Sequence, residues 1–228
     1  MPNELPNNLK LFMEDKKSSG TILVALGTNV RWINAPNSTQ EAFNHTLRRL
    51  SDYRIIFVYD GDKLNDMPPH IRVLKWAPQH GILSHQSTRL FISHGGLKSL
   101  KEAICSKTPM LILPLFAEQT VNGAFAQKLG FARTISKSAL SGEKLYSVAI
   151  DLLTHPRYTE RITTVKDIFT DKVINPLEEA KFWINRTIKM QKISEKFKRK
   201  GMFLYTFQYF YMPEIVALSV LILFMAIF

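Results

Sequence analysis

Short, mostly apolar runs alternate with amphipathic stretches along most of the chain. The runs lie at 21–26, 54–59, 71–76, 90–92, 110–113 and, more weakly, 131–135. Apolar residues at helical spacing lie at 41–50, 97–107, 122–129, 142–154, 157–171 and 177–190. Runs without strict alternation are typical of strands buried on both faces of a parallel sheet. Strands that alternate with helices predict an α/β fold with a Rossmann-like, doubly wound parallel sheet.

One strand, turn and helix stand out between residues 90 and 107. The apolar strand ends in Ser93-His94-Gly95-Gly96, and an amphipathic helix follows at once. Glycine permits backbone angles that other residues resist, so it suits a tight turn. The free N–H groups and the positive dipole end at such a helix start attract an anion, usually phosphate. The pattern therefore predicts a phosphate-binding βαβ unit.

The composition narrows the classes of partner. The 228 residues carry a formal net charge of +11, and a dense basic run covers 189–200. A basic run beside an apolar tail favours a membrane surface over nucleic acid, and no zinc-finger or RNA-binding motif is present. The single cysteine, Cys105, excludes an internal disulfide. No GxGxxG follows Leu26, which disfavours a nicotinamide-dependent oxidoreductase.

The apolar composition of the C-terminal part predicts a membrane anchor. Residues 215–228 are uninterruptedly apolar but reach only about 21 Å as a helix, against a hydrocarbon core of about 30 Å. A helix extended back to residue 207 would be long enough to span the bilayer, with tyrosines near the membrane interface. We expect a transmembrane helix over 207–228 after a basic juxtamembrane segment over 191–206. Sequons at Asn37, Asn44 and Asn185 hint at exposure in the lumen.

A longer motif gives the chain a family resemblance. Its residues are Phe91-Ile92-Ser93-His94-Gly95-Gly96, Glu102, Pro109, Pro114 and Glu118-Gln119, with Leu26-Gly27-Thr28 and Trp76-Ala77-Pro78-Gln79 upstream. This pattern resembles the donor-domain signature of the UDP-glycosyltransferases of the glucuronosyltransferase type. The resemblance covers nearly the whole chain but about half of a full family member. It implies the C-terminal half of a glycosyltransferase B fold, with an interdomain leader over 1–19 and a UDP-sugar-binding domain over 20–190.

The resemblance also implies roles for particular residues. Trp76 would stack on uracil and Gln79 would bind the nucleoside, while Glu102 would accept the ribose hydroxyls. The diphosphate would be contacted by Thr28, His94, Gly96 and Ser99. Glu118 and Gln119 would hold hydroxyls of the sugar. The resemblance implies no metal ion and no other cofactor.

Two positions depart from the family pattern. Lys98 stands where members often have asparagine, and it would either strengthen the diphosphate contact or face solvent. Glu118 stands where many members have aspartate, which leaves the choice of sugar open.

The implied activity is transfer of a sugar from UDP-glucuronic acid or UDP-glucose to a small lipophilic acceptor, with inversion at the anomeric carbon. The general base and the acceptor pocket belong to the family's other domain, so we expect no catalytic residue in this chain and little activity from it alone. The alternative is a non-catalytic membrane partner that binds UDP-sugar or modulates full-length transferases as an oligomer. The resemblance places the protein in the endoplasmic reticulum membrane as a single-pass glycoprotein, with the domain in the lumen.

Overall fold

The computed structural model describes residues 5–61, 64, 66–190 and 198–227. It divides into one unit over Met1–Asp171 and a second over Lys172–Phe228. Each unit is described by itself.

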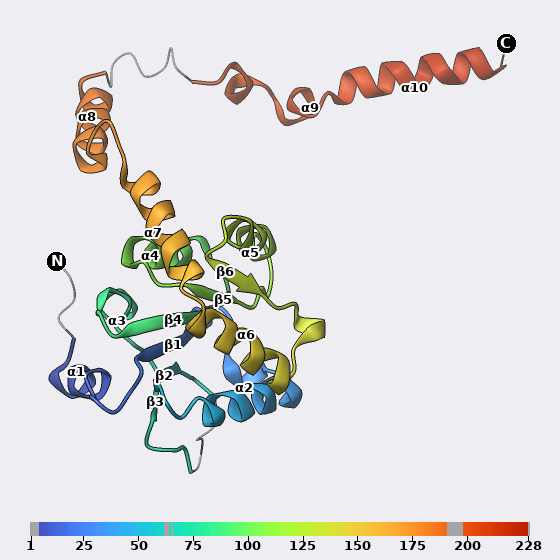
Figure 1. The fold of residues 1–228 in the computed structure, drawn as a ribbon. Coiled ribbons are helices and arrows are strands. Elements are labelled where there is room, and N and C mark those ends of the chain that lie inside the picture. The colour runs from blue at the N-terminus through green and yellow to red at the C-terminus, as the bar shows by residue number, and fades with distance from the viewer. Residues whose placement is uncertain (1–4, 62–63, 65, 191–197, 228) are drawn as a thin grey trace. The chain divides into compact units, whose positions relative to one another are not determined.

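The first unit is built on a six-stranded sheet (Figure 1). Its strands are β1 (Thr21–Ala25), β2 (Arg54–Val58), β3 (Ile71–Leu74), β4 (Thr88–Ser93), β5 (Met110–Ile112) and β6 (Ala132–Thr134). They lie in the order β3-β2-β1-β4-β5-β6, and every neighbouring pair is parallel. This confirms the doubly wound parallel sheet, including the short edge strand β6. The order reverses between β1 and β4, where Ala25 is in register with Ser93.

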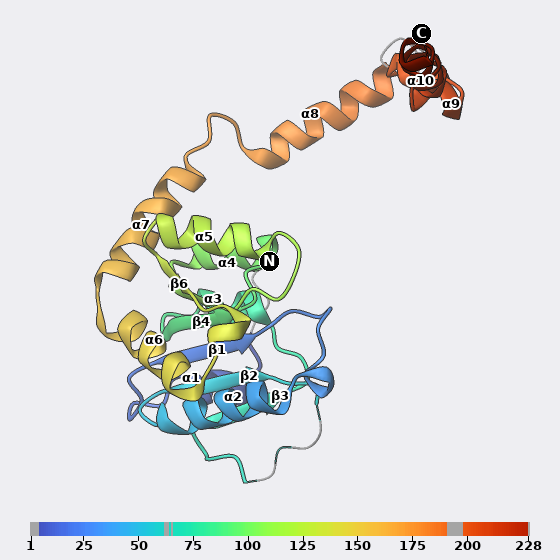
Figure 2. The same ribbon diagram turned by 90° about the vertical axis from the view of Figure 1, so that its right-hand side faces the viewer.

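Helices cover both faces of this sheet (Figure 2). The unit contains α1 (Asn7–Met13), α2 (Asn37–Arg49), α3 (Gln79–Ser84), α4 (Leu97–Ser106), α5 (Gln119–Lys128), α6 (Gly142–Thr154) and α7 (Arg157–Thr170), with 3-10 turns at Trp32–Asn34 and Lys137–Ala139. Ile22 and Val24 of β1 pack into a core with α2 and α6. Leu23 and Ala25 point the other way, into a core with α1, α3, α4, α5 and α7. This alternation along a fully buried strand explains why its sequence is apolar throughout.

The sequence located most of these elements but missed parts of them. It predicted a leader over 1–19, whereas residues 7–13 form α1 and bury Leu9 and Met13 against the sheet. It also missed α3, a short helix after Pro78 that contains Gly81. Both α2 and α5 begin a few residues earlier than expected, because their first turns carry no apolar residues at helical spacing.

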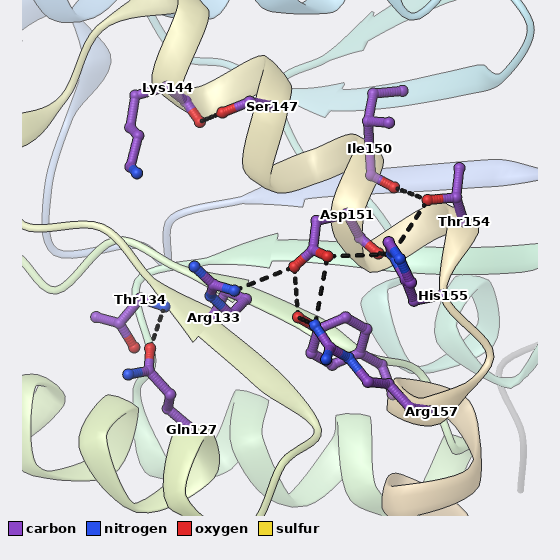
Figure 3. Close-up of polar contacts among 11 residues, drawn as sticks. Gln127, Arg133, Thr134, Lys144, Ser147, Ile150, Asp151, Thr154, His155 and Arg157 are labelled. Atoms are coloured by element: carbon purple, nitrogen blue, oxygen red, sulfur yellow. Dashed lines mark hydrogen bonds and ion pairs between the residues drawn. The ribbon is translucent and has the colours of Figure 1, made fainter.

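Asp151 links its own helix α6 to β6 and α7 (Figure 3). Its carboxylate accepts hydrogen bonds from Arg133 of β6, at 3.2 Å, and from the Tyr158 hydroxyl of α7. Arg157 and His155 lie 3.4 and 3.1 Å from its other oxygen. A partly buried carboxylate with several donors needs no external partner. We therefore regard this cluster as structural.

The second unit contains α8 (Pro176–Lys189), a 3-10 turn over Lys200–Phe203, α9 (Thr206–Tyr209) and α10 (Met212–Ile227). The single helix expected over 207–228 is wrong, because Tyr211, at a φ of 54°, separates α9 from α10. The 16 residues of α10 reach about 24 Å. Within the described part of the chain, no helix is both long and apolar enough to cross a membrane. Residues 191–197 of the predicted basic segment lie outside the described residues.

Candidate functional site

The carboxyl ends of β1 and β4 meet at the point where the strand order reverses. Gly27 and Thr28 follow β1, and the turn His94-Gly95-Gly96 follows β4 and leads into α4. In open α/β sheets, ligands bind in the crevice at this topological switch point. The two glycine turns that the sequence singled out therefore lie side by side where a ligand is expected.

The imidazole of His94 is confined between two glycines. A Cβ on Gly27 would lie 2.8 Å from Cε1 of His94, and a Cβ on Gly96 would lie 2.6 Å from its Nε2. Gly27 and Gly95 both have a φ of +83°, a conformation that strains other residues. Ser93 Oγ lies 3.4 Å from Nδ1 of His94. The turns need glycine for their backbone angles and also for the room that the ring occupies.

Gln79, Ser99 and Glu102 form a hydrogen-bonded group between α3 and α4. The amide Nε2 of Gln79 donates to Oε2 of Glu102 at 2.7 Å and to Oγ of Ser99 at 3.2 Å. Ser99 and Glu102 lie three residues apart, so they share one side of α4. These hydrogen bonds hold the Glu102 carboxylate in place. Its other oxygen, Oε1, takes part in none of the hydrogen bonds described for this part of the chain.

The loop between β5 and α5 forms the opposite wall. Ala117 adopts a left-handed φ of 53°, a conformation that costs free energy outside glycine. The buried side chain of Gln119 holds this loop, since its Oε1 accepts from the backbone N–H groups of Leu115, at 2.8 Å, and Phe116, at 3.1 Å. One turn along α5, Asn122 donates from Nδ2 to the carbonyl of Gly95 at 2.9 Å. No local pattern in the sequence indicated the roles of Ala117 and Asn122.

These walls enclose a cavity of about 570 Å³. It is lined by eight of the nine predicted binding residues: Thr28, Gln79, His94, Gly96, Ser99, Glu102, Glu118 and Gln119. The ninth, Trp76, lies outside this lining, in the loop before α3, and 70% of its surface is exposed. Its ring is thus accessible to a planar group.

The cavity mixes neutral, negative and positive groups. Burial lowers the pKa of His94 below its ordinary value of 6.5, and the negative charge of Glu118 opposes this shift only partly. His94 is therefore mainly neutral at pH 7. No group of three His, Cys, Asp or Glu side chains in the described residues is placed to hold a metal ion. The polar lining can accept hydroxyl hydrogens at its carboxylates and offer N–H groups at the start of α4 to an anion.

Comparison with known proteins gives the family. The family model "UDP-glucoronosyl and UDP-glucosyl transferase" matches residues 1–228. The chain belongs to this family. A UDP-glucuronosyltransferase from Pleuronectes platessa is 34% identical over 187 residues, which are 81% of this chain and 39% of that protein. UDP-glucosyltransferase 2 from Dactylopius coccus is 30% identical over 96% of this chain and 42% of its own length. The chain thus spans about two fifths of the length of these relatives.

A solved structure agrees with the fold of the first unit. The UDP-glucose: anthocyanidin 3-O-glucosyltransferase in complex with UDP superposes with a TM-score of 0.65 at 20% identity. The match covers 76% of this chain and 41% of that protein. At this identity the likeness establishes the α/β fold with a parallel sheet, as in glycosyltransferases of the B type.

Proposed function

We propose that this chain binds a UDP-sugar and supplies the donor-binding part of a glycosyltransferase. The observation that carries the proposal is the convergence of four chain segments on one cavity at the β1/β4 switch point. Thr28 follows β1, Gln79 begins α3, and the His94 turn opens α4. The loop before α5 adds Glu118 and Gln119. Family membership supports the same function.

The proposed donor lies along the cavity with its base near Trp76 and Gln79. Oε1 of Glu102, whose other oxygen is held by Gln79, accepts from the ribose hydroxyls. The diphosphate meets Thr28, His94 and the N–H groups at the start of α4. The sugar lies beside Glu118 and the amide group of Gln119. Oε1 of Gln119 already accepts hydrogen bonds from two backbone N–H groups of the loop.

These contacts would serve transfer of the sugar from UDP-glucose or UDP-glucuronic acid to a small lipophilic acceptor. Negative charge grows on the leaving diphosphate in the transition state, and fixed N–H donors stabilise it without further reorganisation. The residues of this chain hold the donor and stabilise the leaving group. A general base for the acceptor hydroxyl would come from another domain.

Titration of the chain with UDP-glucose at several pH values tests the proposal. We expect binding, with an affinity that rises about three- to tenfold between pH 7.5 and 6.0. The pKa of His94 is lowered in the free protein because burial disfavours its charged form. A bound diphosphate restores part of that charge and raises the pKa, so the complex takes up a proton and binds more tightly at lower pH.

Two histidine variants give this titration its control. His94→Gln removes the titrating group from the cavity and should flatten the pH dependence. His80→Gln changes an exposed histidine of α3 outside the cavity lining, so this variant should keep the pH dependence of the wild type. Calorimetry that detects no binding of UDP-glucose by the wild-type chain would overturn the proposed function.

We also propose that the protein is a glycoprotein attached to the endoplasmic reticulum membrane through its apolar C-terminal segment. The apolar run over 215–228 and the three sequons support this, since Asn37, Asn44 and Asn185 are all exposed. We expect a mass decrease on glycosidase treatment of the chain made in animal cells. The decrease should vanish when all three asparagines are replaced by glutamine. A wild-type mass that the glycosidase leaves unchanged would contradict the proposal.

A further inference from the structure

We propose that Lys98 is the cationic partner of the donor diphosphate, an inference that rests on the proposed function. Lys98 lies in the first turn of α4 and lines the cavity. Among the described lining residues, it is the only lysine or arginine. The sequence left open whether this side chain serves the diphosphate or only faces solvent, and its position in the cavity lining favours the diphosphate.

The charges around Lys98 support this role. Glu102 and Glu118 line the same cavity, yet neither forms an ion pair with Lys98 among the described contacts. In the free protein His94 adds little positive charge, because it is mainly neutral at pH 7. An exposed ammonium group, not held by a carboxylate, is therefore available to a dianionic ligand.

The position of Lys98 on its helix gives a second argument. Cα–Cβ bonds of a helix tilt toward its N-terminus, so the side chain of Lys98 extends toward the Gly95-Gly96 turn. The first turn of α4 contains no acidic residue, and no side chain caps the helix. A cation there opposes the helix dipole and lowers helix stability. An anion that binds beside Lys98 offsets this repulsion between the lysine and the helix dipole, and this favours the bound state.

The test compares Lys98→Gln with Lys101→Gln, measured with UDP and with uridine. Lys101 lies one turn further along α4, is exposed and does not line the cavity. We expect Lys98→Gln to weaken UDP binding about five- to twentyfold, and this loss should shrink as salt screens the charges. Uridine has no phosphate, so its affinity should not change. Lys101→Gln should bind UDP within about twofold of wild type.

Thermal unfolding separates the loss of affinity from a loss of fold. Removing a cation from the start of α4 should raise the Tm by about 1–3 °C, although the affinity for UDP falls. Lys98→Gln that binds UDP as tightly as wild type, or that loses UDP and uridine equally, would overturn the role of Lys98. A wild-type chain that binds no UDP would instead overturn the proposed function.

Discussion

We expect Gly27→Ala to lower the affinity of the chain for UDP-glucose by about tenfold or more. The new Cβ would lie 2.8 Å from Cε1 and 3.0 Å from Nε2 of His94, too close for either atom. On its other side the ring lies close to Gly96, where an added Cβ would lie 2.6 Å from Nε2. The imidazole must therefore shift away from the position in which we propose that it meets the diphosphate. Calorimetric titration measures the loss.

Gly130→Ala is the matched control for this variant. Gly130 has a φ of +85°, against +83° for Gly27, so both alanines carry a similar backbone strain of about 1–2 kcal/mol. A Cβ on Gly130 would lie 3.2 Å from Cγ of Arg161, a flexible side chain outside the cavity lining. Both variants should lose stability, and only Gly27→Ala should lose affinity. Equal UDP-glucose affinities in the two variants would show that His94 does not contact the ligand.

Trp32→Ala should lower the free energy of unfolding by about 3–5 kcal/mol. The Trp32 side chain is only 5% exposed, and its ring lies 4.9 Å from that of Phe43 and 5.1 Å from that of Phe57. Its indole N–H donates to the carbonyl of Val58 at 3.1 Å. Alanine would leave a large cavity and an unpaired carbonyl group. Denaturant unfolding measures the change.

The neighbouring position provides the comparison. Ile33 follows Trp32 in the same 3-10 turn but is 51% exposed, so Ile33→Ala should change the free energy of unfolding by about 0.5 kcal/mol or less. If Trp32→Ala cost no more than Ile33→Ala, the aromatic cluster would not anchor the loop after β1. That loop carries Thr28, so the variant also tests how firmly this wall of the cavity is held.

Local patterns in the sequence predicted the sheet because its strands are mostly apolar, and central strands such as β1 and β5 are buried at every position. Thr21–Ala25 is buried at every position, and its run is apolar enough to be recognised alone. By contrast, α3 is too short for a helical period to appear, and a proline and a glycine obscure it. The apolar run near the C-terminus predicted one helix, because composition does not reveal the left-handed Tyr211 that precedes α10.

The candidate site shows the same limit at the level of side chains. The motif identified His94, Glu102 and Gln119 as candidates, and in the structure all three line one cavity. It could not show that Oε1 of Gln119 is used by two backbone N–H groups. Nor could it reveal the bond from Asn122 to Gly95. Such contacts depend on how distant segments pack, and no local spacing encodes that.

The bonds of α5 have a consequence for how this site can change. Gln119 fixes the loop before α5 and Asn122 fixes the turn at Gly95, so one helix sets the spacing between these two walls of the cavity. An insertion into residues 115–118 would shift the helix or break one of these bonds, and the spacing of the walls would change with it. Redesign of this cavity for another ligand is therefore safest through side-chain replacement at a constant loop length.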